Sequence, residues 1–247
     1  MIRLGLIGKK LSHSFSQSYF QELFRVKGIS GQYDLIEIDH ISIFEELRDK
    51  GYRGFNVTIP YKEEIIPYLD ELDDLALAIG AVNTILVDAK GKTRGYNTDI
   101  IGLESSIKDW MPLSQSGNQA LILGSGGAGK SVAELMKKYK IPSFFAQRSE
   151  NGYVDIEDYI ATCPLIFQCS PLGMYPQIES YPPLPYSLLG PQHYLFDMIY
   201  NPEKTIFIQE GIKAGAKTKN GLEMLYAQAG AAWKIWGIED ENNQNNI

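Results

Sequence analysis

The stretch that decides the fold is Gly124-Ser125-Gly126-Gly127-Ala128-Gly129-Lys130-Ser131, a glycine-rich turn near the middle of the chain. An apolar run over 120–123 precedes it and a helical pattern over 131–139 follows, so it joins a predicted strand to a predicted helix. Glycines at such a turn let backbone N–H groups approach phosphate oxygens, and the positive end of the helix strengthens the attraction. We therefore expect a phosphate-bearing ligand at this turn.

Two motifs fit this turn. It matches GxGxxG, which is typical of dinucleotide-binding domains, and GxxxxGK[ST], which is typical of P-loop nucleotidases. A P-loop enzyme also requires an acidic residue at the end of an apolar strand, and Asp197 after the run 194–196 meets that requirement. The turn alone leaves both alternatives open.

The residues about twenty positions beyond the turn favour a particular dinucleotide. At the end of the next strand, an acidic residue is typical of NAD-binding domains because it binds the adenosine ribose. Here the predicted strand 143–146 runs into Gln147, Arg148 and Ser149. An arginine and a hydroxyl suit the 2′-phosphate of NADP by charge and hydrogen bonding. We predict NADP as the cofactor and keep NAD as the alternative.

Strands and helices alternate on both sides of the turn, which predicts an α/β fold with a Rossmann-like second half. The predicted strands are 2–7, 33–38, 55–59, 81–87, 120–123, 143–146, 165–168 and 194–197. Residues 88–92 form a predicted hairpin turn that leads to 93–96, an antiparallel edge on a mostly parallel sheet. A long proline-rich loop over 171–191 and a closing helix over 222–236 complete the pattern.

A helical pattern over 100–110 and a polar stretch over 112–118 indicate a domain boundary. We expect an N-terminal substrate domain with a mostly parallel sheet, formed by 1–99 and 221–247. Residues 100–220 form the predicted dinucleotide-binding domain.

The composition excludes several classes of protein. The chain has 247 residues, of which 44% are hydrophobic, and a formal net charge of -7. Nucleic-acid binding needs a clustered basic face that the sequence does not offer. No apolar run approaches the ~18 residues of a membrane helix. Two cysteines are too few for a disulfide framework, and three scattered histidines do not indicate a metal site. We expect a cytoplasmic protein, a monomer or a homodimer, without partners among nucleic acids or membranes.

Polar clusters occur where predicted strands of the first half meet loops. They are 12–16, 56–62, 83–84 and 97–99. Parallel strands bring such ends together at one edge of a sheet. Reduction of a ketone needs a proton donor at the carbonyl oxygen, and Lys62 with a nearby carboxylate, Asp99, meets that need.

These stretches, taken in order, resemble the successive signatures of the shikimate dehydrogenase family. The resemblance runs from about residue 5 to 237. It rests on Ser12-His13-Ser14-Phe15-Ser16, Gly54-Phe55-Asn56-Val57-Thr58-Ile59-Pro60-Tyr61-Lys62, Gly80-Ala81-Val82-Asn83-Thr84, Gly95-Tyr96-Asn97-Thr98-Asp99, Gly126-Gly127-Ala128, Ser170-Pro171-Leu172-Gly173-Met174, Asp197-Met198-Ile199-Tyr200-Asn201-Pro202 and Gly221-Leu222-Glu223-Met224-Leu225-Tyr226-Ala227-Gln228-Ala229.

The resemblance implies reversible NADPH-dependent reduction of 3-dehydroshikimate to shikimate, a step of aromatic amino acid biosynthesis. It implies Lys62 and Asp99 as the catalytic pair. The implied substrate contacts are Ser14 and Ser16 for the carboxylate, Tyr200 near it, and Thr58, Asn83, Asp99 and Gln228 for the ring hydroxyls or the support of Lys62. The implied cofactor contacts are Gly124, Ser125, Gly126, Gly127, Ala128, Gln147, Arg148, Ser149, Met198 and Gly221.

The chain departs from the family pattern in the nucleotide half. Gly129-Lys130-Ser131 stands where alanines usually follow, Gln147-Arg148-Ser149 replaces Asn-Arg-Thr without the expected second arginine, and Gln168-Cys169-Ser170 replaces Asn-x-[ST]. Simpler interpretations of single residues also exist: Ser14, Ser16 and Asp99 suit helix caps, Asp99 for a helix that begins at Ile100. The alternatives are a P-loop nucleotidase, a quinate or shikimate dehydrogenase that uses NAD, and a catalytically silent dinucleotide sensor.

Overall fold

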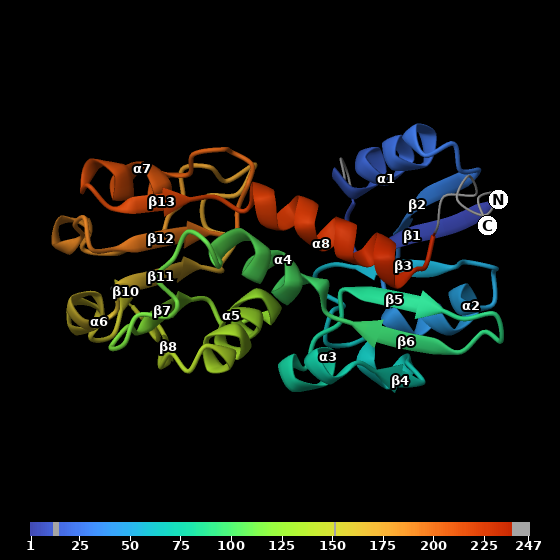
Figure 1. Cartoon of the computed structure of the whole chain (residues 1–247), viewed down its shortest axis with the longest axis horizontal. Coiled ribbons are helices and arrows are strands. Elements are labelled where there is room, and N and C mark those ends of the chain that lie inside the picture. The colour runs from blue at the N-terminus through green and yellow to red at the C-terminus, as the bar shows by residue number, and fades with distance from the viewer. Residues whose placement is uncertain (12–14, 151, 239–247) are drawn as a thin grey trace, which may run out of the picture. The chain divides into compact units, whose positions relative to one another are not determined.

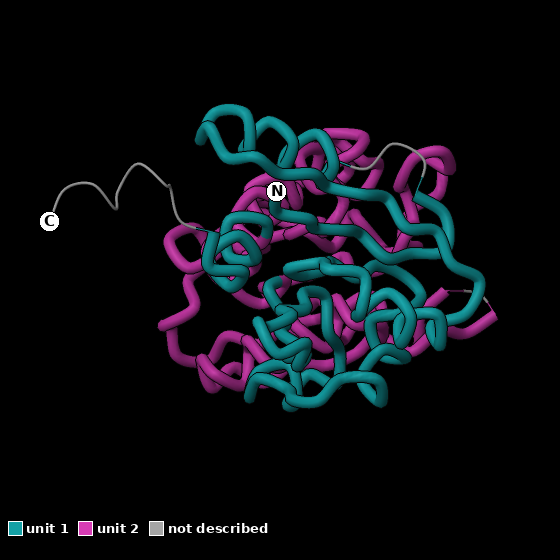
Figure 2. The backbone as a smooth tube through the Cα atoms, turned by 90° about the vertical axis from the view of Figure 1, so that its right-hand side faces the viewer, with its two compact units in different colours: residues 1–98, 229–247 teal, residues 99–228 magenta. Residues whose placement is uncertain are grey.

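The computed structural model describes residues 1–11, 15–150 and 152–238. The chain divides into two compact units, residues 1–98 with 229–247 and residues 99–228 (Figure 2). Each unit has its own sheet, and both sheets are covered by helices (Figure 1). The predicted α/β class is therefore confirmed.

The first unit contains a six-stranded mixed sheet in the order β2-β1-β3-β5-β6-β4 (Figure 1). Its strands are β1 Ile2–Gly8, β2 Gly31–Glu37, β3 Gly54–Val57, β4 Glu71–Leu72, β5 Thr84–Val87 and β6 Thr93–Tyr96. Strand β1 is parallel to β2 and β3, whereas β5 runs antiparallel to both of its neighbours, β3 and β6. The carboxyl ends of β1, β3 and β6 and the start of β5 consequently lie along one edge of the sheet.

Helix packing in this unit follows from apolar spacing. Helix α1 (Phe15–Val26) buries Phe20 and Phe24, four residues apart on one face, against Trp233 and Trp236 at the end of helix α8 (Leu222–Ile235). The Trp236 indole also donates to the Ile85 carbonyl at 2.9 Å. The short helices are α2 (Phe44–Arg48) and α3 (Asp74–Ile79), with 3₁₀ turns at Ile41–Ile43 and Ile66–Tyr68.

The second unit contains a five-stranded parallel sheet in the order β13-β12-β11-β7-β8. Its strands are β7 Ala120–Leu123, β8 Ser143–Phe145, β11 Leu165–Gln168, β12 Tyr194–Asp197 and β13 Lys217–Lys219. Its helices are α4 Thr98–Ile107, α5 Gly127–Lys138, α6 Ile156–Thr162 and α7 Ile206–Lys213, with a 3₁₀ turn at Tyr186–Leu188 and a small hairpin of β9 Arg148–Ser149 and β10 Gly152–Tyr153. The strand order reverses at β7, which is the topological switch point where Rossmann-type folds bind their ligands.

Several predicted boundaries were wrong by a few residues. Helix α5 begins at Gly127 rather than at Ser131 because the glycine turn itself forms the first helical turn. Helix α4 begins at Thr98, so Asp99 lies in its first turn and is not an N-cap. Strand β4 pairs outside β6, so the predicted hairpin is not the edge of the sheet. The sequence did not predict β13 because Lys217, Thr218 and Lys219 carry no apolar pattern.

Candidate active site

The glycine turn between β7 and α5 gives each motif glycine a different environment. A Cβ on Gly129 would lie 2.0 Å from the Gly124 carbonyl oxygen, so this glycine lets the helix pack against the turn. Gly124 has φ of +123°, and a Cβ there would lie 2.9 Å from the backbone of Cys169. A Cβ on Gly126 would meet nothing within 4 Å. These environments agree with the roles of the glycines in GxGxxG: the first forms the tight turn, the middle one leaves room for a pyrophosphate, and the last lets the helix pack closely.

The turn presents backbone donors to that open space. Gly126 is the N-cap of α5, and no side chain satisfies the N–H groups of the first turn from that position. Ser125 and Gly126 are exposed, and Gly127 and Ala128 are half-buried. A helix start of this kind attracts anions through its N–H groups and its dipole. The residues present therefore fit the pyrophosphate of a dinucleotide.

The same geometry argues against the P-loop alternative. In that motif the Ser131 hydroxyl would bind a metal ion, but here Ser131 is fully buried and donates to the Gly127 carbonyl at 3.0 Å. Asp197, the predicted acidic partner, lies on β12 and is separated from β7 by β11. Its carboxylate accepts from Thr205 and from the Ile199 amide. Neither group is placed to hold a metal ion at the turn.

The adenosine side of the predicted site lies beyond β8. Gln147, Arg148 and Ser149 are all exposed, and Arg148 with Ser149 forms one strand of the small hairpin. Arg148 also interacts with Tyr153 on the other strand, where burial raises the pKa of the tyrosine and the arginine opposes that rise. The hairpin thus carries an exposed arginine and an exposed serine in consecutive positions, the two residue types that suit a 2′-phosphate.

A buried network of side chains organises the polar edge of the first unit. The Asn83 carboxamide oxygen accepts from the Thr98 amide at 2.7 Å, from the Thr98 hydroxyl at 3.1 Å and from the Thr84 hydroxyl at 3.2 Å. Asn56 donates to the Thr84 hydroxyl and to the Asn83 carbonyl, both at 3.2 Å. The start of β5 and the exit of β6 are therefore fixed to each other directly before Asp99.

This edge also contains the other predicted residues of the first unit. Thr58 follows β3 and is half-buried, and its amide donates to the Ile7 carbonyl. Lys62 is half-buried, and its carbonyl accepts from the Val82 amide at 2.7 Å, next to Asn83. Ser16 lies in α1 and hydrogen-bonds with the Tyr33 hydroxyl. Ser14 lies outside the described residues.

Two predicted substrate residues lie in the second unit with Asp99. Gly102 lets α4 approach α8 closely, because a Cβ on it would lie 2.6 Å from the Met224 carbonyl oxygen and 3.0 Å from the Gln228 Cβ. Gln228 therefore lies beside the start of α4, the part that carries Asp99. Tyr200 lies in the loop after β12 and is 39% exposed, although its environment raises the pKa of its hydroxyl by desolvation.

Gly221, a predicted cofactor residue, packs tightly inside the second unit. A Cβ on it would lie 2.2 Å from the Met198 carbonyl oxygen. Its amide donates to the Ile199 carbonyl at 3.2 Å. The absence of a side chain at 221 is thus required by the neighbouring segment 198–199.

Sequence reasoning missed the supporting residues of both units. Tyr33 donates to the Asn56 carboxamide at 2.7 Å and so extends the polar network to Ser16. Gln168 and Asp197 each hold a loop of the second unit by side-chain hydrogen bonds. For Gln168 and Asp197 the sequence signal is a polar residue at the end of an apolar strand, whereas Tyr33 lies within β2 and gives no such signal.

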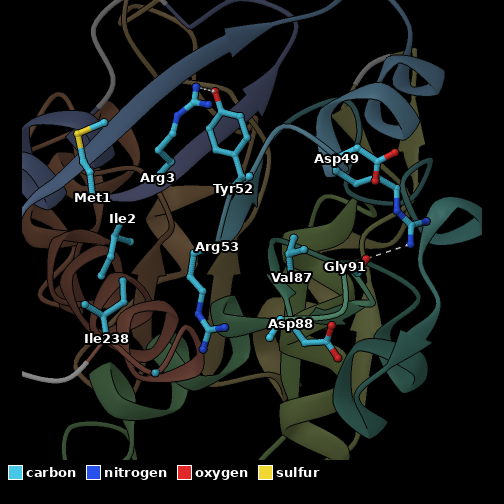
Figure 3. Close-up of a pocket in the computed structure, with 14 residues that line it drawn as sticks. Met1, Ile2, Arg3, Asp49, Tyr52, Arg53, Val87, Asp88, Gly91 and Ile238 are labelled. Atoms are coloured by element: carbon cyan, nitrogen blue, oxygen red, sulfur yellow. Dashed lines mark hydrogen bonds between the residues drawn. The ribbon is translucent and has the colours of Figure 1, made fainter.

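A hollow of about 670 Å³ opens in the first unit at the other edge of its sheet (Figure 3). Its lining comes from the start of β1, the end of α2, the residues just before β3, the end of β5 with the turn after it, and residues 237–238. No predicted site residue lines it. Strand β1 has seven residues, so the two edges are about 20 Å apart at ~3.3 Å per residue. Two arginines that line the hollow form ion pairs, Arg3 with Asp34 at 3.1 Å and Arg48 with Asp70 at 2.8 Å.

The described residues contain no group of three or more His, Cys, Asp or Glu side chains that could hold a metal ion. Among the same residues, no helix has the length and apolar character needed to cross a membrane.

The fold and these sites define a class of protein: a two-domain oxidoreductase with a substrate domain and a Rossmann-like nucleotide-binding domain. The family model "Shikimate dehydrogenase substrate binding domain" matches residues 6–85. The shikimate dehydrogenase (NADP(+)) of Halothermothrix orenii is 34% identical over 269 residues, a match that covers 96% of this chain and 92% of that protein. The chain belongs to the shikimate dehydrogenase family.

Solved structures of the family have the same fold. The shikimate dehydrogenase of Aquifex aeolicus superposes with a TM-score of 0.86 at 33% identity, covering 96% of this chain and 93% of that one. The Thermus thermophilus enzyme in complex with NADP(H) and shikimate gives 0.85 at 28% identity, covering 98% and 96%. A quinate dehydrogenase from Corynebacterium glutamicum in complex with NAD gives 0.83 at 25% identity, covering 98% and 96%. These relatives do not support the P-loop nucleotidase.

Proposed function

We propose that this chain catalyses the reversible NADPH-dependent reduction of 3-dehydroshikimate to shikimate. The observation that carries the proposal is a family match that spans both the polar edge and the glycine turn, over 96% of the chain. The open space at Gly126 supports a dinucleotide as the ligand of the turn. Together they join a cofactor site and a site for a polar substrate in one chain.

The proposed substrate suits the side chains assigned to it. A polyhydroxylated ring acid offers many hydrogen-bonding groups and little apolar surface, so Ser, Thr, Asn and Gln are the residue types that it requires. We assign the carboxylate to Ser14 and Ser16, with Tyr200 near it. The ring hydroxyls are assigned to Thr58, Asn83, Asp99 and Gln228.

Lys62 and Asp99 form the proposed catalytic pair. When bound, the reduced nicotinamide supplies a hydride to the ketone carbon. The Lys62 ammonium donates a proton to the ketone oxygen, and the Asp99 carboxylate orients that ammonium and balances its charge. In the reverse direction, Lys62 accepts the proton of the hydroxyl. Such general acid–base catalysis typically contributes about 10²–10⁴-fold in rate.

We assign the cofactor to the second unit. The pyrophosphate binds residues 124–128, Gln147, Arg148 and Ser149 bind the adenosine end, and Met198 and Gly221 lie on the nicotinamide side. The predicted substrate domain, 1–99 with 221–247, and the predicted cofactor domain, 100–220, correspond to the two compact units except that Asp99 and residues 221–228 belong to the second unit. The cytoplasm, where NADPH-dependent biosynthesis takes place, is the proposed location.

The Corynebacterium glutamicum relative supports one second candidate, a dehydrogenase that oxidises quinate with NAD. The missing second arginine after Arg148 favours it for the cofactor, whereas Arg148 and Ser149 favour NADP.

The test is a kinetic assay of the purified chain with shikimate or quinate and with NADP⁺ or NAD⁺, followed by the absorbance of the reduced nicotinamide. We expect the highest kcat/KM with shikimate and NADP⁺. Turnover only with quinate and NAD⁺ would establish the second candidate. Tight NADPH binding without turnover of either acid would indicate a silent sensor.

A matched lysine variant separates the dehydrogenase from a nucleotidase in the same assay. Lys130→Ala removes the lysine that a P-loop needs, and we expect it to leave kcat for shikimate within about threefold of wild type, because a P-loop lysine has no part in hydride transfer. ATP hydrolysis that disappears in Lys130→Ala would contradict the proposal.

A further inference from the structure

Two polar side chains lie side by side at the carboxyl edge of the second unit's sheet. Gln168 ends β11 and Asp197 ends β12, and the two residues are paired in the parallel register. Both are fully buried. A buried polar group at such a place must find partners, because an unsatisfied one is costly.

The Gln168 side chain hydrogen-bonds to the loop that follows β11. Its carboxamide oxygen accepts from the Ser170 amide at 3.1 Å and from the Ser170 hydroxyl at 3.0 Å. Its carboxamide nitrogen donates to the Leu172 carbonyl at 3.0 Å. One side chain therefore fixes the backbone of 170–172, the loop that resembles the family's Ser-Pro-Leu-Gly-Met.

Asp197 holds both ends of the loop that follows β12. One carboxylate oxygen accepts from the Ile199 amide at 3.0 Å, and the other accepts from the Thr205 hydroxyl. Thr205 is also the N-cap of α7, where its hydroxyl accepts from the Ile208 amide at 3.3 Å. The carboxylate thus connects the strand exit to the start of the next helix.

The segment between these anchors has little freedom. The Met198 amide donates to the Gln168 carbonyl at 3.0 Å, which ties the two loops together. Gly221 lies directly against the Met198 carbonyl oxygen and donates to the Ile199 carbonyl. Tyr200, the next residue, is by contrast 39% exposed. A rigid base therefore carries an accessible side chain.

We propose that Gln168 and Asp197 are positioning residues for hydride transfer, which set the backbone of 170–172 and of Met198 and thereby the placement of the nicotinamide-side loop and of Tyr200, the residue assigned to the substrate carboxylate. The inference rests on the proposed function. In this role both buried side chains act through the loop groups that they bind, not through contact with substrate. Their effect is geometric, and a displacement of about 1 Å at a reacting centre can lower the rate by about 10².

The test compares variants at the two ends of β12. Asp197→Ala removes both anchors, and Asp197→Asn keeps them, because its oxygen accepts from Ile199 and its nitrogen donates to Thr205. The matched control is His193→Ala, just before the start of the strand, where a buried histidine accepts from the Gly190 amide and bonds the Ile160 carbonyl. Each variant is measured for thermal unfolding, for NADPH affinity and for the kinetics of shikimate oxidation.

We expect Asp197→Ala to lower kcat/KM by about 10–100-fold, in kcat more than in KM for shikimate. Asp197→Asn should return to within about threefold of wild type. His193→Ala should lower the unfolding temperature by a similar amount without a loss in kcat/KM beyond about threefold. Equal kinetic losses in Asp197→Ala and His193→Ala, or no recovery in Asp197→Asn, would overturn the proposal.

Two further measurements keep the outcome decisive. If Asp197→Ala does not fold, Thr205→Val replaces it in the comparison, because it removes the Thr205 anchor, together with the cap of α7, and leaves the bond between Asp197 and the Ile199 amide. Hydrogen exchange at the Ile199 and Ser170 amides should rise in Asp197→Ala and Gln168→Ala, respectively, and not in His193→Ala. If wild type does not oxidise shikimate, the proposed function fails, whereas amide exchange and NADPH affinity still decide whether these residues hold the loops.

Discussion

The polar edge of the first unit is built from side chains, whereas the glycine turn of the second unit is built from backbone groups. At the edge, Asn56, Asn83, Thr84 and Thr98 are buried and hydrogen-bond to one another. At the turn, the same task falls to backbone N–H groups, and the side chains are absent where a ligand would approach. A binding site built from side chains can be recognised in the sequence by its residue types. A binding site built from backbone groups leaves only glycines as its signal in the sequence.

The largest effect is expected from Gly129→Ala. Its Cβ would lie 2.0 Å from the Gly124 carbonyl oxygen, so α5 would have to move away from the turn. We expect the free energy of unfolding to fall by about 4 kcal/mol or more, measured by urea denaturation. A loss in the free energy of unfolding below about 1 kcal/mol would show that α5 and the turn can move apart easily, and so that the backbone of the turn is not rigid.

Asn83→Ala tests the side-chain network on the other side of the comparison. It removes the acceptor of three hydrogen bonds and leaves the buried Thr98 amide and hydroxyl without that partner. We expect a loss of about 3 kcal/mol in the free energy of unfolding, at about 1–3 kcal/mol per unsatisfied group.

Asn97→Ala is the control for Asn83→Ala. It removes a buried asparagine from the same edge, but that side chain donates to the Ala81 carbonyl and does not accept from Thr84 or Thr98 as Asn83 does. It should be the milder of the two in the same urea titration. The reverse order would contradict the central place of Asn83 in the edge.

The second unit also uses a buried side chain to hold its backbone, and this one, Asp197, can titrate. Burial raises the pKa of Asp197 to about 7 from 3.8. A carboxyl with a raised pKa binds its proton more tightly in the folded state, so its contribution to stability is full at low pH and is lost as the pH rises through about 7. Between about pH 5 and pH 8, the stability of wild type relative to Asp197→Asn should fall by about 2 kcal/mol. Parallel pH profiles of the two proteins would rule out a titrating Asp197.

Gly126→Ala should have the smallest effect on folding. Alanine at an N-cap is less favourable than glycine, but it also restricts the unfolded chain, and both effects are below about 1 kcal/mol. The new Cβ would occupy the open space in front of the turn, so NADPH affinity should fall by about tenfold or more. Fluorescence titration with NADPH measures this, and unchanged affinity would exclude the turn as the pyrophosphate site.

The sequence predicted the parts of the molecule that local patterns encode. The strands around 120–123, 165–168 and 194–197 were predicted within a residue because short apolar runs between turn residues leave few alternatives. The order of strands and the neighbourhood of β11 and β12 depend on tertiary pairing, which no local pattern encodes. For this reason the sequence showed Gln168 only as part of a departure from the family pattern, and Asp197 only as the acidic residue that the P-loop alternative requires, although both hold loops.

The glycine turn is a second case in which the sequence alone does not decide between two interpretations. Its letters satisfy two patterns, and only the contacts of Gly124, Gly126 and Gly129 distinguish them. Ser131 looked available in the sequence, but its hydroxyl is used inside the helix.

The proposed acid–base role of Lys62 is tested by comparing the turnover of Lys62→Ala with its affinity for NADPH. We expect kcat for shikimate oxidation to fall by at least about 100-fold, because proton transfer is lost, and the NADPH dissociation constant to stay within about twofold of wild type. Lys90→Ala, an exposed hairpin lysine of the same unit, should change neither value. A Lys62→Ala enzyme that retains kcat within about threefold would contradict the proposed chemistry.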